Sequence, residues 1–323
     1  MQVMARIWPV LLVVLQYFSV PVDVCQIPEE NTRLTQSLNL KLLRSTLDVS
    51  AEPNPSVYVG LRLSDDHSLV REEEYLERLK VSLKTITSTK GQDQEKLSTG
   101  ILALHLLAMK SSCEDMNTPE RKKLITQLKR KLHDEKTHLV SHNNLISNHY
   151  QYSLGILTLC VNDKKVDNHV VYHLLQEELN NKFVHGDTIS IDTEAMAGLA
   201  FLCLKRSKLY TADLMVKIRN GITNIKQKII NSKNTDGSLG NIYSTPLAVQ
   251  FLSALGTSND EKECSQAIGA LLDAMKKGQF SNPMMMSQLM PVLHQKSYLD
   301  VTKTDCTINK STLYINLSFW YTT

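Results

Sequence analysis

The stretch Asp192-Thr193-Glu194-Ala195-Met196-Ala197-Gly198-Leu199 decides the fold of this chain of 323 residues. Polar residues open it, and the residues that follow are apolar on nearly all sides of a helix, which is typical of a helix enclosed by other helices. Similar segments begin at residues 98, 150 and 245, and a weaker one begins at residue 287. The five starts, at residues 98, 150, 193, 245 and 287, are separated by 52, 43, 52 and 42 positions, and such a period indicates stacked pairs of helices.

The stretches between these segments are charged and amphipathic, as in residues 120–129, Glu-Arg-Lys-Lys-Leu-Ile-Thr-Gln-Leu-Lys. We therefore expect them to form outer helices around an inner ring, an arrangement known as an α/α toroid. Glycine and proline are scarce, with 12 and 9 residues, and no linker is long enough to separate two domains. The sequence predicts a single all-α domain in which every inner helix begins at the same end.

That common end forms a mouth, where the first turns of the inner helices present free N–H groups and positive dipole ends. Mostly uncharged polar side chains stand there: Tyr150, Gln151, Asp192, Thr193, Asn241, Ser244, Ser287 and Gln288. Helix capping is the alternative for each single residue, because Ser, Thr, Asp and Asn are the preferred caps. Capping does not require Gln or Tyr, so the whole set predicts a polar binding surface.

The composition argues against several classes of function. The formal net charge is only +3, and the densest basic run, residues 121–131, alternates with apolar residues as a solvated helix face does. We expect no nucleic-acid partner. An α/α-barrel enzyme, such as a glycosidase, lyase or terpenoid cyclase, would need paired carboxylates or an acidic metal cluster. Glu194 points about 200° away from Asp192 on the same helix, so we expect no enzyme, although this class remains the alternative.

The N-terminus has the pattern of a secretory signal peptide over about residues 1–24. Arg6 precedes an apolar run from Ile7 to Val20, which is too short to span a bilayer comfortably. No later stretch approaches a membrane span, so we expect a secreted, extracellular protein with no membrane partner. Asn309 and Asn316 begin glycosylation sequons, which suit a secreted glycoprotein.

Six cysteines follow the predicted signal peptide: Cys25, Cys113, Cys160, Cys203, Cys264 and Cys306. An even number in a secreted chain predicts three disulfides, for which 15 pairings are possible. Cys160 and Cys203 close the C-terminal ends of two successive inner helices, so parallel neighbours that end level would bring them together. Zinc ligation is the alternative, but the sequence has no CxxC motif.

Several ordered runs resemble the cobalamin-binding family of transcobalamin, intrinsic factor and haptocorrin, and the transcobalamins most closely. They span residues 55–63, 150–157, 192–201, 240–252 and 287–293. The resemblance implies an α6–α6 barrel over residues 25–306. It also implies a secreted carrier that binds and transports cobalamin (vitamin B12), has a cell-surface uptake receptor as a partner and has no enzymatic activity.

The resemblance further implies which residues act. Cobalamin contacts in the family correspond to Tyr150, Gln151, Asp192, Asn241, Ser244 and Gln288. Its disulfides correspond to Cys25–Cys264, Cys113–Cys306 and Cys160–Cys203. Transcobalamin also offers a histidine to cobalt from the loop before residue 192. The histidine of that loop here is His185, so His185 is the candidate axial ligand, and a solvated bystander is the alternative.

Two departures from the family pattern bear on binding. Family members continue into a smaller β domain, with the ligand between the two domains, whereas this sequence has a tail of 17 residues, 307–323, after Cys306. We therefore expect a half-site without the β domain, which binds cobalamin more weakly and releases it faster than a two-domain relative. A truncated or isoform product that binds little is the alternative. The second departure is the loop before residue 192, where Thr188, Ile189 and Ser190 precede the helix and the histidine, His185, stands further back. Ile101 is another departure, because transcobalamin has a polar contact residue there.

Overall fold

The computed structural model describes residues 25–88, 97–256, 261–304 and 306. These residues contain twelve α-helices and almost no sheet. In chain order the helices are α1 (Thr32–Ser45), α2 (Pro55–Arg62), α3 (Leu69–Ser88), α4 (Thr99–Ser111), α5 (Pro119–His142), α6 (His149–Val161), α7 (Asn168–Leu179), α8 (Ile191–Ser207), α9 (Ala212–Asn231), α10 (Thr245–Leu255), α11 (Glu261–Lys276) and α12 (Pro283–Leu293).

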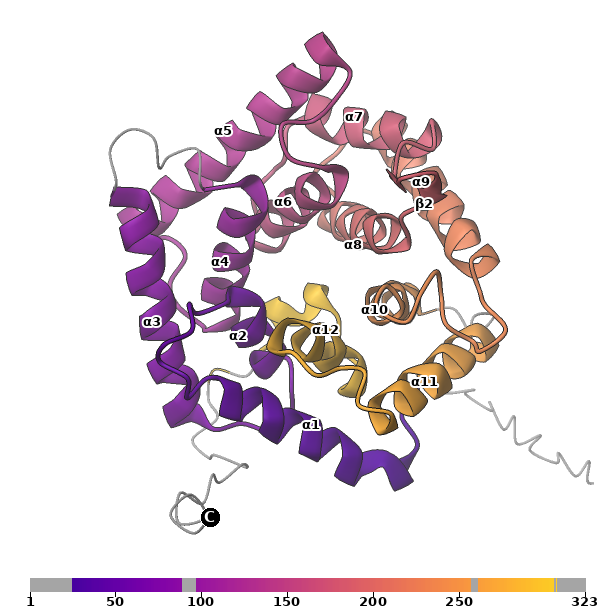
Figure 1. Cartoon of the computed structure of the whole chain (residues 1–323). Helices are drawn as coiled ribbons and strands as arrows, with labels where there is room; N and C mark the ends of the chain where they lie inside the picture. The colour runs from indigo at the N-terminus through magenta and orange to yellow at the C-terminus, as the bar shows by residue number, and fades with distance from the viewer. Residues whose placement is uncertain (1–24, 89–96, 257–260, 305, 307–323) are drawn as a thin grey trace, which may run out of the picture.

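The even-numbered helices form an inner ring and the odd-numbered helices surround it (Figure 1). Each inner helix packs against the next, and α12 packs against α2 to close the ring. The predicted all-α barrel of six inner and six outer helices is therefore confirmed for the described residues.

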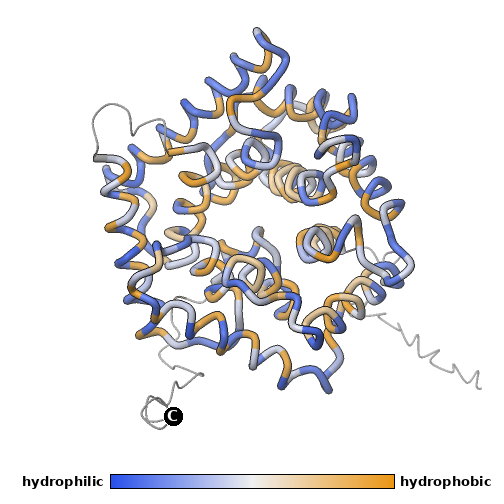
Figure 2. The backbone as a smooth tube through the Cα atoms, in the orientation of Figure 1, coloured by the Kyte–Doolittle hydropathy of each residue, from blue (hydrophilic) through white to orange (hydrophobic). Residues whose placement is uncertain are grey.

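Hydropathy explains which helices lie inside. Inner helix α8 buries residues on all its sides, and every residue of α2 is buried. Outer helices such as α5 and α9 have one apolar face, and Figure 2 shows blue and orange alternating along the outer ring. An outer helix buries that one face against the inner ring, so part of the hydrophobic core lies between the two rings.

Three disulfides tie the barrel together, and they are the pairs implied by the family resemblance. Cys160–Cys203 joins the ends of α6 and α8, with 6.1 Å between the Cα atoms, as predicted from the level ends of neighbouring inner helices. Cys25–Cys264 links the start of the described chain to α11. Cys113–Cys306 links the segment after α4 to the last described residue.

The structure adds three elements to those expected from the sequence. The first is α2, which the spacing argument omitted and which is the sixth inner helix. The second is a short antiparallel hairpin before α8, formed by β1 (Val184–His185) and β2 (Thr188–Ile189). The third is the 3-10 helix η4 (Tyr298–Thr302), which packs against the inner helices α4, α6 and α8. A shorter 3-10 helix, η1 (Glu29–Asn31), precedes α1.

None of the described helices is both long enough and apolar enough to cross a bilayer. The predicted signal peptide at residues 1–24, the tail at 307–323 and the sequons at Asn309 and Asn316 lie outside the described residues.

Candidate functional site at the mouth of the barrel

The starts of the inner helices gather around two adjoining hollows. One, of about 860 Å³, is lined by residues that include Asp192, Asn241, Ser244 and Gln288. The other, of about 540 Å³, is lined by Tyr150, Gln151 and again Asp192. His185 and Ser190 also line both hollows. The structure therefore brings all six predicted contact residues and the candidate cobalt ligand to one place.

The start of α6 supplies Tyr150 and Gln151. Asn148 caps this helix by accepting a hydrogen bond from the Gln151 backbone N–H at 2.9 Å, so capping does not use the Gln151 side chain. The Gln151 Oε1 instead accepts from the Gly100 N–H at 3.0 Å, which joins α6 to the start of α4. This bond orients the Gln151 amide and leaves its NH₂ group as the donor for a ligand.

The hydroxyl of Tyr150 stays protonated at any physiological pH. Burial raises the pKa of Tyr150 well above its ordinary value of 10, and the nearby Tyr298 and Asp192 raise it further. Burial also raises the pKa of Tyr298, which belongs to η4, to about 12. A protonated Tyr150 hydroxyl can both donate and accept a hydrogen bond.

The start of α8 supplies Asp192. Ser190 occupies the N-cap position but makes no side-chain capping bond. Its hydroxyl donates to Asp192 Oδ1 at 2.5 Å, and the Thr193 N–H donates to the same oxygen at 2.9 Å. The carboxylate is exposed and oriented by these two bonds. Asp192 thus takes part in the local structure of the helix start and also lines both hollows.

The loop before α10 holds Asn241 and Ser244. Asn241 Oδ1 accepts from the backbone N–H groups of Tyr243 and Ser244, at 2.8 and 2.9 Å, which leaves the Asn241 NH₂ group for a ligand. The buried Ser244 hydroxyl lies 2.7 Å from the carbonyl of Leu239 and accepts from the Asn241 N–H at 3.0 Å. Ser244 therefore lines the hollow while its single proton is used within the loop.

A glycine lets this loop lie against α8. Gly240 has φ of 72°, a backbone conformation that favours glycine, and an added Cβ would lie 2.6 Å from Ile191 Cγ1. The close approach places Asn241 beside the start of α8.

The middle of α12 supplies Gln288. The position of Gln288 depends on a buried glutamine of α10. Gln250 Nε2 donates to the Gln288 carbonyl at 3.1 Å, and Gln250 Oε1 accepts from the Tyr298 N–H at 3.2 Å. Gln250 thus connects α10, α12 and η4. The bond to Gln288 uses its backbone carbonyl, so the side-chain amide of Gln288 is left for the hollow.

A buried group of charges lies behind the α8 side of the mouth. Lys228 of α9 lines the larger hollow, and its Nζ donates to Glu178 Oε1 at 2.8 Å and to Glu194 Oε1 at 2.9 Å. It also donates to the Glu178 backbone carbonyl at 3.0 Å, so all three N–H bonds are used. Burial raises the pKa of Glu194 to about 7 despite the neighbouring Lys228. Lys228 therefore has no N–H left for an anionic ligand.

The chemistry of the mouth is that of recognition. It offers amide and hydroxyl donors, one oriented carboxylate, and apolar contacts from Ile101, Leu104 and Leu154. Across the described residues, no three His, Cys, Asp or Glu side chains are grouped so as to hold a metal ion. Such a surface fits a large neutral ligand with many hydrogen-bonding groups at its rim.

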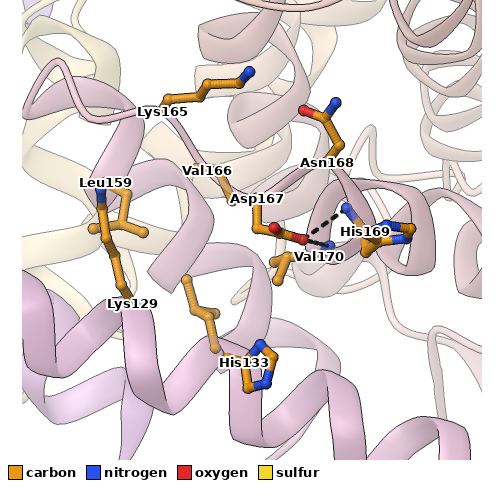
Figure 3. Close-up of a pocket in the computed structure, with 10 residues that line it drawn as sticks. Lys129, His133, Leu159, Lys165, Val166, Asp167, Asn168, His169 and Val170 are labelled. Carbon is orange, nitrogen blue, oxygen red and sulfur yellow. Dashed lines mark hydrogen bonds between the residues drawn. The ribbon is translucent and has the colours of Figure 1, made fainter.

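Another hollow, of about 580 Å³, lies near the opposite end of α6 and is shown in Figure 3. Lys129 and His133 of α5 line it, together with Lys165 and His169. Its carboxylate, Asp167, caps α7 by accepting from the N–H groups of His169 and Val170 at 2.9 and 3.3 Å. None of the predicted contact residues lies in this hollow.

Comparison with known proteins shows the family to which the chain belongs. The sequence model of the family described as eukaryotic cobalamin-binding protein matches residues 7–318. The chain belongs to this family. It is 40% identical over 313 residues to transcobalamin-2 of Mus musculus, covering 92% of this chain and 71% of that protein. It is 39% identical over 301 residues to transcobalamin-2 of Homo sapiens, covering 88% and 68%.

A crystal structure of haptocorrin in complex with Cbi is also similar. Its TM-score is 0.75 at 27% identity, and the match covers 88% of this chain and 72% of that one. Members of the cobalamin-binding family thus share this barrel at low sequence identity.

Sequence reasoning missed several residues that shape this family member's mouth. Gln250 and Tyr298 lie behind the predicted contacts, and Ser190 orients Asp192. Tyr243, 47% exposed, lines the larger hollow and packs edge-on against Phe280. Ser190 and Tyr243 lie within two positions of predicted contact residues. Attention to the loops before α8 and α10 could therefore have identified both from the sequence. Gln250 and Tyr298 are buried, and nothing in the local sequence marked them.

Proposed function

We propose that this chain binds cobalamin at the mouth of the barrel and transports it as cargo. Cobalamin has a large flat corrin ring with neutral amides at its rim. Amide and hydroxyl side chains satisfy such a rim by reciprocal hydrogen bonds without burying an unpaired charge. The observation that carries the proposal is the convergence of such side chains on two adjoining hollows. They come from the starts of α6 and α8, the loop before α10 and the middle of α12.

The hydrogen bonds within the site suggest a role for each predicted residue. Gln151 and Asn241 have fixed amide oxygens, so their NH₂ groups donate to the carbonyl oxygens of the ligand's amides. The side chain of Gln288 can donate or accept. Asp192 accepts from a ligand amide, and Tyr150 donates through its hydroxyl. Ser244 shapes the loop that presents Asn241.

Apolar residues complete the surface. Ile101 is 39% exposed and lines the hollow beside Tyr150 and Gln151. Its aliphatic side chain would contact the methyl groups or the face of the corrin, where a polar residue would form a hydrogen bond instead. Ile101 therefore remains part of the site. Compared with the transcobalamin pattern, only the type of contact changes, from polar to apolar.

We also propose that His185 is the protein ligand to cobalt. It stands on β1 and lines both hollows, within reach of a ligand that spans them. Replacing His185 with Gln should change the visible spectrum of bound hydroxocobalamin, because the axial ligand changes. An unchanged spectrum for this variant would show that His185 does not coordinate cobalt.

The remaining features are consistent with a carrier. We propose a secreted, extracellular protein with a signal peptide over about residues 1–24, one cobalamin-binding barrel over 25–306, and no catalytic activity. Three disulfides suit an oxidising, extracellular environment. A cell-surface uptake receptor would then be its second partner.

A visible-spectrum titration tests the proposal. The secreted protein is titrated with hydroxocobalamin and, separately, with cobinamide, which lacks the nucleotide. Saturable binding of one equivalent with a spectral change is the expected result for hydroxocobalamin. No binding at tens of micromolar ligand would contradict the proposed function.

A further inference from the structure

The C-terminal end of α5 carries two histidines one helical turn apart, on the outside of the barrel. His138 and His142 are at positions i and i+4, which places their side chains on the same face of the helix. Their rings are stacked, with centroids 4.2 Å apart and an angle of 18° between the planes. Nothing in the proposed cobalamin site uses either residue.

The hydrogen bonds of His138 fix its tautomer. Its Nδ1 lies 2.9 Å from the backbone carbonyl oxygen of Asn144. A carbonyl oxygen only accepts, so Nδ1 carries the proton and Nε2 of the neutral ring keeps its lone pair. A ring N–H donated to a backbone carbonyl is also the usual arrangement behind a histidine that ligates a metal.

His142 has the same tautomer by a second route. Its Nδ1 lies 2.7 Å from the hydroxyl oxygen of Ser141. That hydroxyl has one proton, which it donates to the Thr137 carbonyl at 2.9 Å. When Ser141 donates to Thr137, the His142 Nδ1 is the donor to Ser141, and the lone pair of the His142 Nε2 is free as well.

The surroundings favour a cation. Helix α5 ends at His142, so His142 lies in the last turn, where the carbonyl groups and the helix dipole attract positive charge, and His138 lies one turn before it. Asp134 is exposed one turn before His138 on the same side of the helix and adds a negative charge.

We propose that His138 and His142 form a surface site for a divalent transition metal ion of the imidazole-preferring class, Cu²⁺, Ni²⁺ or Zn²⁺. The two Nε2 atoms are the protein ligands, and water completes the coordination because no third His, Cys, Asp or Glu of the described residues joins them. Binding requires the rings to turn from the stacked arrangement until both lone pairs meet one ion about 2.0–2.1 Å away. His142 is exposed at the helix end, so its ring is free to make this rotation.

A second histidine pair with the same spacing provides a matched control. His169 and His173 are also at positions i and i+4, on α7. His173 is partly buried, and its ring packs edge-on against Tyr172, with 6.0 Å between the centroids. The His173 ring is therefore less able to turn toward an ion shared with His169, and we expect no site there.

The test uses the untagged full chain and Cu²⁺, the ion of this class with the highest affinity for nitrogen ligands. Binding is measured by calorimetry and by electron paramagnetic resonance, for the unmodified protein, His138→Gln, His142→Gln and the double variant His169→Gln/His173→Gln. We expect one equivalent bound with a nitrogen-coordinated spectrum, weakened at least about 10-fold in each single variant because the chelate is lost, and unchanged in the double variant.

Three results would overturn the proposal. They are the absence of a stoichiometric Cu²⁺ site, unchanged binding in both single variants, or loss of binding in the His169→Gln/His173→Gln control. All four substituted side chains lie on outer helices, and circular dichroism of each variant verifies that the barrel remains folded.

Discussion

At the residue scale, the hydrogen bonds within the mouth separate side chains that a ligand can use from those that hold the site in shape. Asn241 keeps a free NH₂ group, whereas the proton of Ser244 is already donated within the loop. The sequence predicted both as contacts because residue type alone does not show which atoms are already bonded. Only the three-dimensional structure shows this difference.

The first prediction concerns Asn241 and Gln288. Replacing either with Ala should weaken cobalamin binding by about 1–3 kcal/mol, because a buried ligand amide loses its partner. Equilibrium titration with hydroxocobalamin measures the effect. Gln36→Ala, at an exposed position on the outer helix α1, is the control and should bind as the unmodified chain does. Normal affinity in both Asn241→Ala and Gln288→Ala would place the ligand elsewhere.

The second prediction is a pH dependence of stability that originates at Glu194. Burial raises its pKa to about 7 from an ordinary value of 4.5. Between these two pKa values the folded state keeps a proton that the unfolded state releases. The contribution of Glu194 to the free energy of unfolding is therefore fully present below pH 4.5 and is lost as the pH rises through 7. The loss should be on the order of 1–3 kcal/mol between pH 5 and pH 8.

The Glu194→Gln variant cannot ionise at this position, so its stability should fall less over the same range. Urea unfolding at pH 5 and pH 8 gives the two free energies of unfolding for each protein. Glu73→Gln removes an exposed carboxylate of α3 and is the control. The same pH dependence in Glu194→Gln and in the unmodified chain would exclude Glu194 as its source.

At the element scale, the sequence predicted the helices that carry long apolar segments and missed the short one. The starts of α4, α6, α8 and α10 lie within two residues of the predicted positions, whereas α12 begins at Pro283, four residues before the predicted start at 287. Helix α2 has only eight residues, begins at Pro55 and contains Gly60, so its sequence indicated a break. Its burial comes from packing against α12 and α4, which are distant in sequence.

The packing of α2 on α12 gives the third prediction. A Cβ at Gly60 would lie 2.8 Å from the carbonyl oxygen and 2.9 Å from the Cα of Ser287, and backbone atoms cannot move aside cheaply. Gly60→Ala should destabilise the barrel by about 1–3 kcal/mol. Thermal unfolding measures the change.

Gly269→Ala is the matched control, because nothing lies within 4 Å of an added Cβ at this exposed position in α11. It should stabilise the chain by up to about 1 kcal/mol, since alanine has the higher helix propensity. Destabilisation by both variants, to a similar degree, would contradict close packing as the cause at Gly60.

At the scale of the whole molecule, the disulfides hold together segments that are distant along the chain. Cys25–Cys264 and Cys113–Cys306 join residues 239 and 193 positions apart. Replacing both cysteines of the Cys25–Cys264 pair with Ser should cost about 2–5 kcal/mol of stability. Denaturant unfolding without reductant measures this cost. Unfolding at the same denaturant concentration as the unmodified chain would show that the ring does not depend on this bond.

The arrangement of six helix pairs in a ring was predictable from the period of the apolar segments together with the family resemblance. The position of the mouth followed from the common direction of the inner helices. The connections behind the mouth were not predictable, since Gln250, Tyr298 and Lys228 act through neighbours far away in sequence.

Hydrogen exchange of the full chain, with and without saturating hydroxocobalamin, tests most directly whether the ligand occupies the mouth. We expect slower exchange in peptides that cover the starts of α6 and α8, the loop before α10 and the middle of α12, and no change at residues 162–168, at the opposite end of α6. Protection confined to residues 162–168, or no protection while the visible spectrum shows bound cobalamin, would contradict the site described above.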